Sequence, residues 1–314
     1  MEAIIEQAPS VVAVVVVTQP AIGFEQVLEG LAAQDYPNLK TLFLVVGEPG
    51  ELPAQIHERV PGAFVRAVVD NPGYGAAANE VMRLVEGRNG FFLLMHDDVA
   101  LDHDAVRVLV EELFRSNAGI VGPKLVDWDK PNVLQHVGLG VDRFGEVDSL
   151  VEPGEIDQEQ HDAVRDVFCL PSACLLVRAD LFHELGGFET SYSFYGDDLD
   201  LCWRAHLSGA RVVVVPEARA RHRERLAQRR PDLPHRVLAA QHRIRTVATL
   251  TGGIRLFGVL LQLLVITLLE MAVGIFTGHF ADAFASLRSL FGPQTISGSA
   301  RIRSSSSNLA RVVG

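Results

Sequence analysis

Six valines and one alanine fill residues 11–17 (VVAVVVV), and this run constrains the fold more than any other part of the chain. An unbroken run of β-branched residues predicts a strand that is buried on both faces, as in a parallel sheet. Three later apolar runs predict further buried strands, at 41–46 (TLFLVV), 64–69 (FVRAVV) and 90–95 (GFFLLM). Apolar residues at helical spacing lie between the strands, at 24–33 and 79–85. This alternation of strand and helix is typical of an open α/β sheet.

The same pattern continues less regularly to residue 216. We predict a helix at 105–114, a short strand at 118–121, a helix at 199–207 closed by Gly209, and a strand at 211–215 ended by Pro216. Residues 127–165 are polar, acidic and rich in turn residues, so they predict loops or short hairpin strands near an open edge.

Composition narrows the class of protein. With 314 residues, of which 48% are hydrophobic, the chain can bury a substantial core, and wholesale disorder is excluded. A net charge of −11 argues against a general nucleic-acid binder, which needs cations to meet phosphates. Three cysteines are too few for a disulfide scaffold and suit a reducing compartment. The opening MEAIIEQAPS lacks the basic stretch of a secretory signal.

Two polar clusters follow predicted strands, where an open α/β sheet binds its ligands. His96-Asp97-Asp98 ends the strand at 90–95, and its carboxylates suit either a divalent cation or the cap of the next helix. Residues 70–79 (DNPGYGAAAN) follow the strand at 64–69 and suit either a phosphate or ribose contact or an ordinary turn.

A third cluster, residues 195–204 (YGDDLDLCWR), holds three acids within four positions at the start of a predicted helix. Repulsion among these carboxylates would raise a pKa and suit a general base, whereas the helix dipole would lower it. Capping of the helix is the alternative explanation. His222 lies just beyond the strand at 211–215, and it becomes a candidate ligand only if a metal at Asp98 needs one.

Together and in this order, these pieces resemble glycosyltransferase family 2, the inverting nucleotide-sugar transferases. The resemblance covers roughly residues 10–225. It rests on the buried first strand with Thr18 and on QDYPNLK (34–40), NPGYGAAAN (71–79), HDDV (96–99), CLPSACLLVRADLFHELGGFET (169–190), YGDDLDLCWRAHLSGARVVVVP (195–216) and His222. It implies the GT-A fold, a Rossmann-like mixed sheet flanked by helices.

The resemblance also implies roles for single residues. Asp98 and His222 would bind a divalent cation, Mn²⁺ or Mg²⁺. Asp198 would be the general base, with Asp197 beside it in the catalytic pair. The nucleotide-sugar would contact Thr18, Glu48, Asp70, Asn71, Gly75, Asn79 and Asp97. Phe194, Tyr195 and Gly196 would line the acceptor side, supported by Trp203 and Arg204. Base and metal would lie on opposite sides of the anomeric carbon, which explains two acidic clusters 100 positions apart.

Two departures from the family pattern keep a second function open. The second strand ends in Gly47-Glu48, where the family has an acid and a Ser-rich turn, so Glu48 or Asp70 would substitute. Gln19-Pro20 follows Thr18 where the family often has Tyr-Asn. The alternative is a non-catalytic GT-A-like module that binds a nucleotide-sugar or scaffolds a membrane assembly. A nucleotidyltransferase is disfavoured, because no basic glycine-rich triphosphate loop lies near the first strand.

The last third of the chain predicts attachment to a membrane. Ten arginines stand against two acids in residues 219–255, and an apolar stretch follows at 256–278. We expect the apolar stretch to span a bilayer or to lie on it, with the arginines near anionic headgroups at the cytoplasmic face. Packing of this stretch on the catalytic domain is the third alternative. We therefore divide the chain into a catalytic domain (1–225), a basic and apolar helical segment (226–292) and a linker or tail (293–314).

The expected function is metal-dependent transfer of a hexose or deoxyhexose. The donor would be a UDP-, dTDP- or GDP-sugar, and the acceptor a hydroxyl of a lipid-linked or cell-envelope glycan. The sequence leaves a homo-oligomer open and predicts no nucleic-acid partner.

Overall fold

The computed structural model describes residues 8–18, 20, 22–68, 72–142, 145–192, 195–224 and 235–250, and isolated pairs between 257 and 272. Asp70, Asn71 and Phe194 lie outside these residues, as do most of the segment at 226–292 and all of 293–314.

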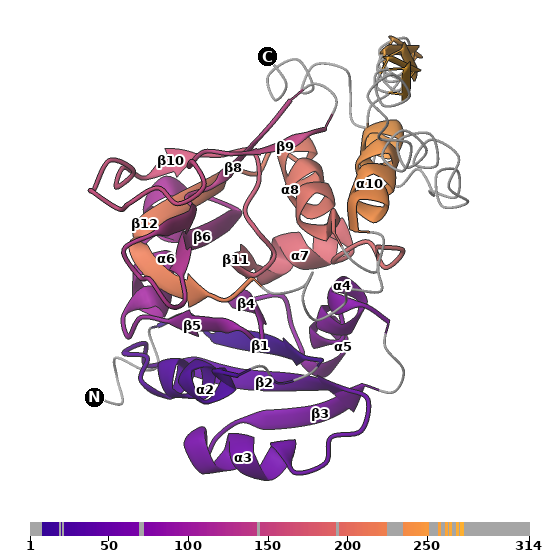
Figure 1. Cartoon of the computed structure of the whole chain (residues 1–314). Helices are drawn as coiled ribbons and strands as arrows, with labels where there is room; N and C mark the ends of the chain where they lie inside the picture. Colours follow the sequence, from indigo (N-terminus) through magenta and orange to yellow (C-terminus); the bar gives the residue numbers. More distant parts are fainter. Residues whose placement is uncertain are drawn as a thin grey trace.

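A mixed sheet of ten strands forms the centre of the molecule (Figure 1). Its order is β10-β12-β6-β11-β4-β1-β2-β3, with β5 paired to β12 and β7 to β6. The strands are β1 (Val11–Val17), β2 (Leu39–Val46), β3 (Phe64–Val68), β4 (Phe91–His96), β5 (Val99–Leu101), β6 (Ile120–Asp127), β7 (Leu134–His136), β10 (Arg165–Asp166), β11 (Cys174–Arg178) and β12 (Val212–His222). Strands β3, β2, β1 and β4 are parallel, and β11 is antiparallel to both β4 and β6.

Strand β1 lies between β2 and β4, and every one of its residues is buried. Successive side chains enter two different cores, with Val15 and Val17 in one and Val14 and Val16 in the other. This confirms the prediction that the valine run is covered on both faces.

Helices cover both faces of the sheet. One core includes side chains of α2 (Phe24–Ala32), α3 (Leu52–Arg59) and α6 (Ala105–Ser116). The other includes side chains of α4 (Tyr74–Ala78), α5 (Val81–Leu84), α7 (Ala179–Leu185) and α8 (Asp197–Leu207). The sequence did not predict α3, β5 or α7, and the helix expected at 79–85 is instead the pair α4 and α5.

Strand β3 is not the buried strand that its sequence predicted. It is the last strand in the order and pairs only with β2, and the side chain of Phe64 is 63% exposed. An apolar run indicates a strand, but it does not reveal how many neighbours that strand will have.

Strand β12 is longer than predicted. It passes through a bulge between Val215 and Arg219, which accommodates Pro216, and then resumes pairing with β6 as far as His222. Proline is tolerated in a strand at such irregularities because no ladder hydrogen bond is required there. Because the strand continues past the bulge, His222 is the last residue of β12.

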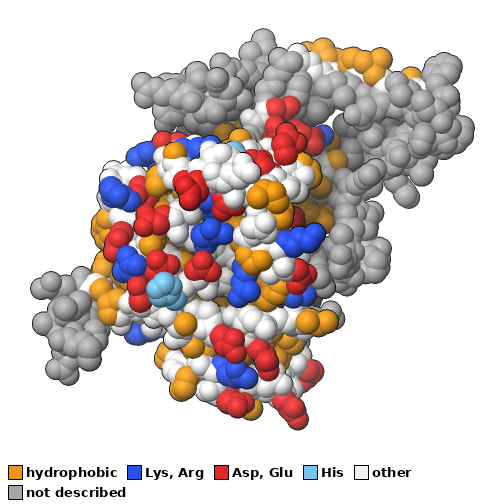
Figure 2. Space-filling model, turned by 60° about the vertical axis from the view of Figure 1, so that its left-hand side comes forward, with side chains coloured by type: hydrophobic (Ala, Val, Ile, Leu, Met, Phe, Trp, Pro, Cys, Tyr) orange, Lys and Arg blue, Asp and Glu red, His pale blue; other side chains and the backbone are white. Residues whose placement is uncertain are grey.

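Residues 127–165 form short strands, as expected. In this region β8 (Leu139–Val141) and β9 (Val147–Ser149) make a separate two-stranded hairpin. Buried Lys124 of β6 forms ion pairs with Asp157 and Asp162, and these ion pairs connect the segment 127–165 to the main sheet. On the face seen in Figure 2, acidic and basic side chains are interspersed.

Helix α10 (His235–Leu250) lies beside α8 (Figure 1). Val247 of α10 joins Leu199 and Trp203 of α8 in a small third core. Arg243 forms an ion pair with Glu146, and Arg245 is 4% exposed.

The expectation that the arginine-rich stretch faces a membrane is therefore wrong for Arg243 and Arg245, whose side chains are used within the domain. Among the described residues, we find no helix that combines the length and apolar character needed to cross a bilayer. Most of the predicted apolar stretch at 256–278 lies outside those residues.

A buried ion pair stabilises α8 from within. Arg204 donates from Nε to an Asp200 carboxylate oxygen at 2.8 Å and from a terminal nitrogen to the carbonyl of Leu185 at 2.9 Å. Both charged side chains are almost fully buried, so neither can lose its partner without a large desolvation penalty.

We predict that Arg204→Met lowers the free energy of unfolding by about 3–5 kcal/mol, because it leaves the Asp200 carboxylate buried without its cation. The double variant Asp200→Leu/Arg204→Met should recover most of that loss. Urea denaturation followed by circular dichroism measures both. A single variant as stable as the double one would contradict the prediction.

Candidate active site

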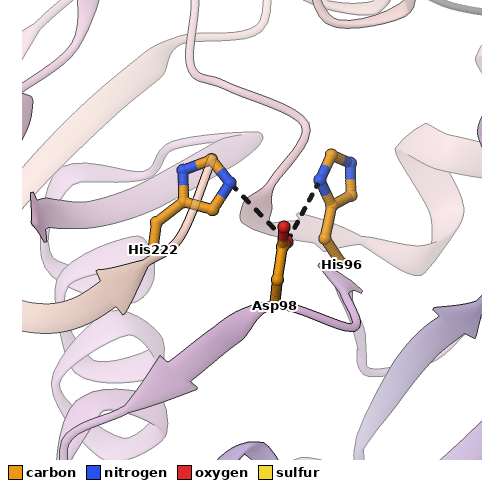
Figure 3. A group of neighbouring side chains, drawn as sticks. All are labelled: His96, Asp98 and His222. Atoms are coloured by element: carbon orange, nitrogen blue, oxygen red, sulfur yellow. Dashed lines mark ion pairs between the residues drawn. The ribbon is translucent and has the colours of Figure 1, made fainter. Parts of the chain in front are cut away.

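Three side chains from two strand ends meet at the sheet edge where β4 and β12 finish. His96 is the last residue of β4, Asp98 lies in the turn to β5, and His222 ends β12. Each offers a ligand atom, and all three atoms lie within 4.8 Å of one another (Figure 3). An Asp98 carboxylate oxygen is 3.9 Å from Nδ1 of His96 and 3.7 Å from Nε2 of His222.

This cluster fits a divalent metal ion. Two atoms that each lie about 2.1 Å from one ion can be at most about 4.2 Å apart. The two distances from Asp98 meet this limit, and the three ligand atoms together lie within 4.8 Å, so a small closure of the two imidazoles would complete the site. Two imidazoles and one carboxylate suit a first-row transition-metal ion better than Mg²⁺, which prefers oxygen ligands. Asp98 and His222 were the predicted ligands. His96 was missed, although it stands two positions before Asp98, at the spacing of an Asp-x-Asp element.

Asp97 lies in the turn between β4 and β5 and contacts the end of the neighbouring strand β1. Its carboxylate accepts a hydrogen bond from the backbone N–H of Thr18 at 3.2 Å. Asp97 is buried, whereas the Thr18 side chain is exposed. The predicted nucleotide-sugar residues Thr18 and Asp97 are thus in direct contact beside the metal cluster.

A second acidic group opens α8. Asp197 and Asp198 follow Gly196 at the N-terminus of this helix, and the N–H of Leu199 donates to Asp198 at 2.8 Å. Ser172 supports both acids, through its hydroxyl for Asp197 and through its backbone N–H for Asp198. Ser172 was not predicted, and no motif in the sequence marks it.

Burial decides the protonation of this pair. Burial is the main reason that the pKa of Asp197 is raised to about 7, and repulsion from the Asp198 carboxylate is the second reason. Burial also raises the pKa of Asp198, against hydrogen bonds from backbone N–H groups and the nearby charge of His136. From the sequence, repulsion between the acids would raise their pKa and the helix dipole would lower it, with no way to decide between them. In the structure, desolvation raises the pKa by more than the nearby groups lower it.

Tyr74 connects the two groups. Its ring lies edge-on to His96 at 4.3 Å, and its hydroxyl donates to the carbonyl of Ser172 at 3.0 Å. Burial raises the pKa of Tyr74, and the charges of Asp197 and Asp198 raise it further. The three-residue cluster and the acidic pair therefore both lie near the partly buried side chain of Tyr74.

His136 and Glu224 border the same region. His136 Nε2 is 3.7 Å from a carboxylate oxygen of Glu224, and the nearness of His136 lowers the pKa of Glu224. Burial raises the pKa of Tyr195, with a further contribution from Glu224. Tyr195, predicted on the acceptor side, thus lies near Glu224, two residues after the predicted metal ligand His222.

Two residues predicted to contact the nucleotide-sugar have structural partners. A Cβ on Gly75 would lie 2.8 Å from Cβ of Phe188, so α4 packs directly on that residue. The Asn79 amide exchanges two hydrogen bonds of 2.8 Å with the backbone N–H and carbonyl of Phe188. These contacts fix the turn, and a direct contact with a donor stays a prediction for both residues.

The other predicted site residues differ in how far they are exposed to solvent. Glu48 is exposed just after β2. Trp203 and Arg204 are buried, one in the core between α8 and α10 and the other in the ion pair with Asp200. Their predicted support of the acceptor side would therefore act through packing.

Comparison with known proteins gives a consistent result. The family model described as "Glycosyltransferase like family 2" matches residues 9–248. The chain is 26% identical over 256 residues to N-acetylglucosaminyl-diphospho-decaprenol L-rhamnosyltransferase of Mycobacterium tuberculosis, covering 74% of this chain and 82% of that protein. It is 27% identical over 211 residues to the O-antigen biosynthesis protein RfbC of Myxococcus xanthus, covering 65% of this chain but only 16% of that longer protein.

Solved structures agree on the fold. GalNAc-T7 with UDP, GalNAc and Mn²⁺ aligns with a TM-score of 0.61 and 11% identity, over 78% of this chain and 48% of that one. The mannosyltransferase PcManGT from Pyrobaculum calidifontis, in complex with GDP-Man and Mn²⁺, aligns with a TM-score of 0.53 and 14% identity, over 91% and 86% of the two chains.

We predict that Asp98→Ala weakens Mn²⁺ binding at least tenfold, because it removes the only carboxylate of the three-residue cluster. Isothermal titration of the whole chain with MnCl₂ measures the affinity. Asp148→Asn, an exposed acid in β9, is the matched control and should bind as the wild type does. Equal affinity in the Asp98→Ala variant would refute the metal site.

The raised pKa of Asp197 predicts a pH-dependent stability. Above its ordinary pKa the unfolded chain releases this proton, while the folded chain holds it to about pH 7. The free energy of unfolding should therefore fall as pH rises from 5 to 7, by up to about 1.4 kcal/mol per pH unit for this group.

Asp197→Asn should remove most of that fall, and Asp148→Asn should preserve it. Urea denaturation in metal-free buffer at several pH values tests this. Parallel pH profiles for Asp197→Asn and Asp148→Asn would show that Asp197 titrates normally.

Proposed function

The chain belongs to the family 2-like glycosyltransferases, and from this premise we propose that it moves a sugar from a nucleotide-sugar donor to a hydroxyl of a lipid-linked or cell-envelope glycan, with inversion. The observation that carries the proposal is the pairing of a metal-compatible cluster with a buried acidic pair, both near Tyr74. Acceptor activation and leaving-group stabilisation need these two kinds of group.

Asp198 is the proposed general base. An inverting transfer needs the acceptor hydroxyl deprotonated as its oxygen attacks the anomeric carbon, and the raised pKa of Asp198 makes its carboxylate a better proton acceptor. Asp197 is mainly protonated below about pH 7, so the adjacent acids do not both carry charge there.

His96, Asp98 and His222 are the proposed ligands of a divalent cation. The cation, when bound, supplies positive charge to the departing nucleoside diphosphate. Thr18 and Asp97 are proposed to contact the nucleotide, because they lie next to this cluster at the end of β1. Tyr195 and Gly196 are proposed to line the acceptor side, at the start of the helix that carries the base.

The class of acceptor is proposed from the relatives. One is named for transfer of L-rhamnose to N-acetylglucosaminyl-diphospho-decaprenol, a lipid-linked sugar, and another for O-antigen biosynthesis. We extend this to a lipid-linked acceptor at the cytoplasmic face of a membrane for this chain. The apolar stretch at 256–278 supports the extension. The alternative of a non-catalytic module would retain donor binding without turnover.

We predict that Asp198→Asn lowers kcat by about 10²–10⁴, the usual contribution of a general base, and changes donor affinity by less than about threefold. The assay is release of nucleoside diphosphate from UDP-, dTDP- and GDP-sugars with Mn²⁺ and a polyprenyl-diphosphate-sugar acceptor. Thermal shift with the same donors reports binding.

The matched control is Asp148→Asn, which should turn over like the wild type. Full activity in Asp198→Asn would remove this residue from the base role. Donor binding by the wild type without any turnover would favour the non-catalytic module instead.

A further inference from the structure

We propose that His242 of α10 is a positioning residue that holds the turn before α8, and through it the proposed base. The inference rests on the proposed function of Asp198, and it assigns a part in the reaction to a helix beyond the catalytic strands. Its basis is a hydrogen bond, the backbone conformation of the turn, and the packing of α10 on both sides of it.

The hydrogen bond joins the imidazole to the turn directly. His242 is 1% exposed, and its Nδ1 lies 2.8 Å from the carbonyl oxygen of Tyr195. Because a carbonyl oxygen only accepts, Nδ1 carries the hydrogen in this contact. The imidazole therefore takes a fixed tautomer and points at the residue three positions before Asp198.

The turn has a conformation that needs support. Tyr195 has φ of 61° and Gly196 has φ of 82°, so two successive residues occupy the left-handed region. This region is unfavourable for a tyrosine, and such conformations persist where surrounding contacts hold them. A Cβ on Gly196 would lie 3.0 Å from Cβ of His242, so the glycine allows α10 to pack against the turn.

Other contacts hold α10 in place around His242. The hydroxyls of Tyr192 and Thr246 are 2.8 Å apart, and the Arg245 guanidinium lies 5.3 Å from the centre of the Tyr192 ring. Arg245 is also 3.8 Å from a carboxylate oxygen of Glu189. Val247 of α10 packs with Leu199 and Trp203 of α8, which follow the turn. Helix α10 therefore contacts both the chain before the turn and α8 after the turn.

The direction of the turn sets the position of the acids. Asp197 and Asp198 are the first two residues of α8, so their carboxylates move with the first turn of this helix. A displacement of about 1 Å at a reacting group can cost about 10²-fold in rate.

The test uses a matched pair of amides in the full-length chain. The amide nitrogen of His242→Asn can occupy the place of Nδ1, whereas His242→Gln places its amide near the position of Nε2. We expect His242→Asn to keep kcat within about threefold of the wild type and His242→Gln to lose at least about tenfold, with KM for the donor unchanged in both. Ala239→Ser is the control, since it changes an exposed residue of α10 and should change kcat by less than about twofold.

A second measurement does not depend on activity. Hydrogen exchange of the peptide covering 192–199 should be faster by about tenfold in His242→Gln and close to wild-type values in His242→Asn and Ala239→Ser. Wild-type kcat in His242→Gln would overturn the positioning role, whatever the exchange rates, and leave the proposed function intact. Absence of sugar transfer by the wild type would overturn the proposed function. If the wild type transfers no sugar, an exchange rate in His242→Gln equal to that of the wild type would also overturn the proposal that His242 holds the turn.

Discussion

The geometry of the site depends on the parallel hydrogen bonding of β1 to strands on both of its sides. Val16 is in register with Leu44 of β2 and with His96 of β4, so the three strands end together. Thr18, Glu48 and Asp97, which follow these strands, therefore lie along one edge although they are far apart in sequence. The valine run provides this arrangement, because a strand without polar positions can be buried only in the middle of a covered sheet.

The two groups at that edge have different electrostatics. At the metal cluster, two imidazoles surround one carboxylate, an arrangement that can be neutralised by a cation. At the start of α8, two carboxylates stand side by side, and their burial favours the protonated form of at least one. Sequence alone listed acids in both places and could not separate these environments, because burial and hydrogen bonding depend on residues such as Ser172 and Tyr74 that come from other elements.

The sequence predicted the strands and helices that have a strong local pattern. The strand at 11–17 and the helix at 24–33 were predicted from composition and spacing, and the resemblance assigned Asp98 and His222 to one metal site. Properties set by neighbours in space were missed. The exposure of Phe64 follows from the single partner of β3, and the burial of Arg245 follows from its contacts with Tyr192 and Glu189. The charge of a residue type predicts solvent or headgroup contact only when no such partner is available.

The contact of α10 with the turn before α8 has a consequence for the order in which the protein can become competent. Residues 11–222 supply the sheet, the metal cluster and both acids, and they leave the ribosome before α10 does. The residues at that sheet edge are therefore synthesised before the turn at Tyr195 can gain its partner on α10. A chain that ends before α10 would lack the contact that we propose positions the base, even though it already holds both acids.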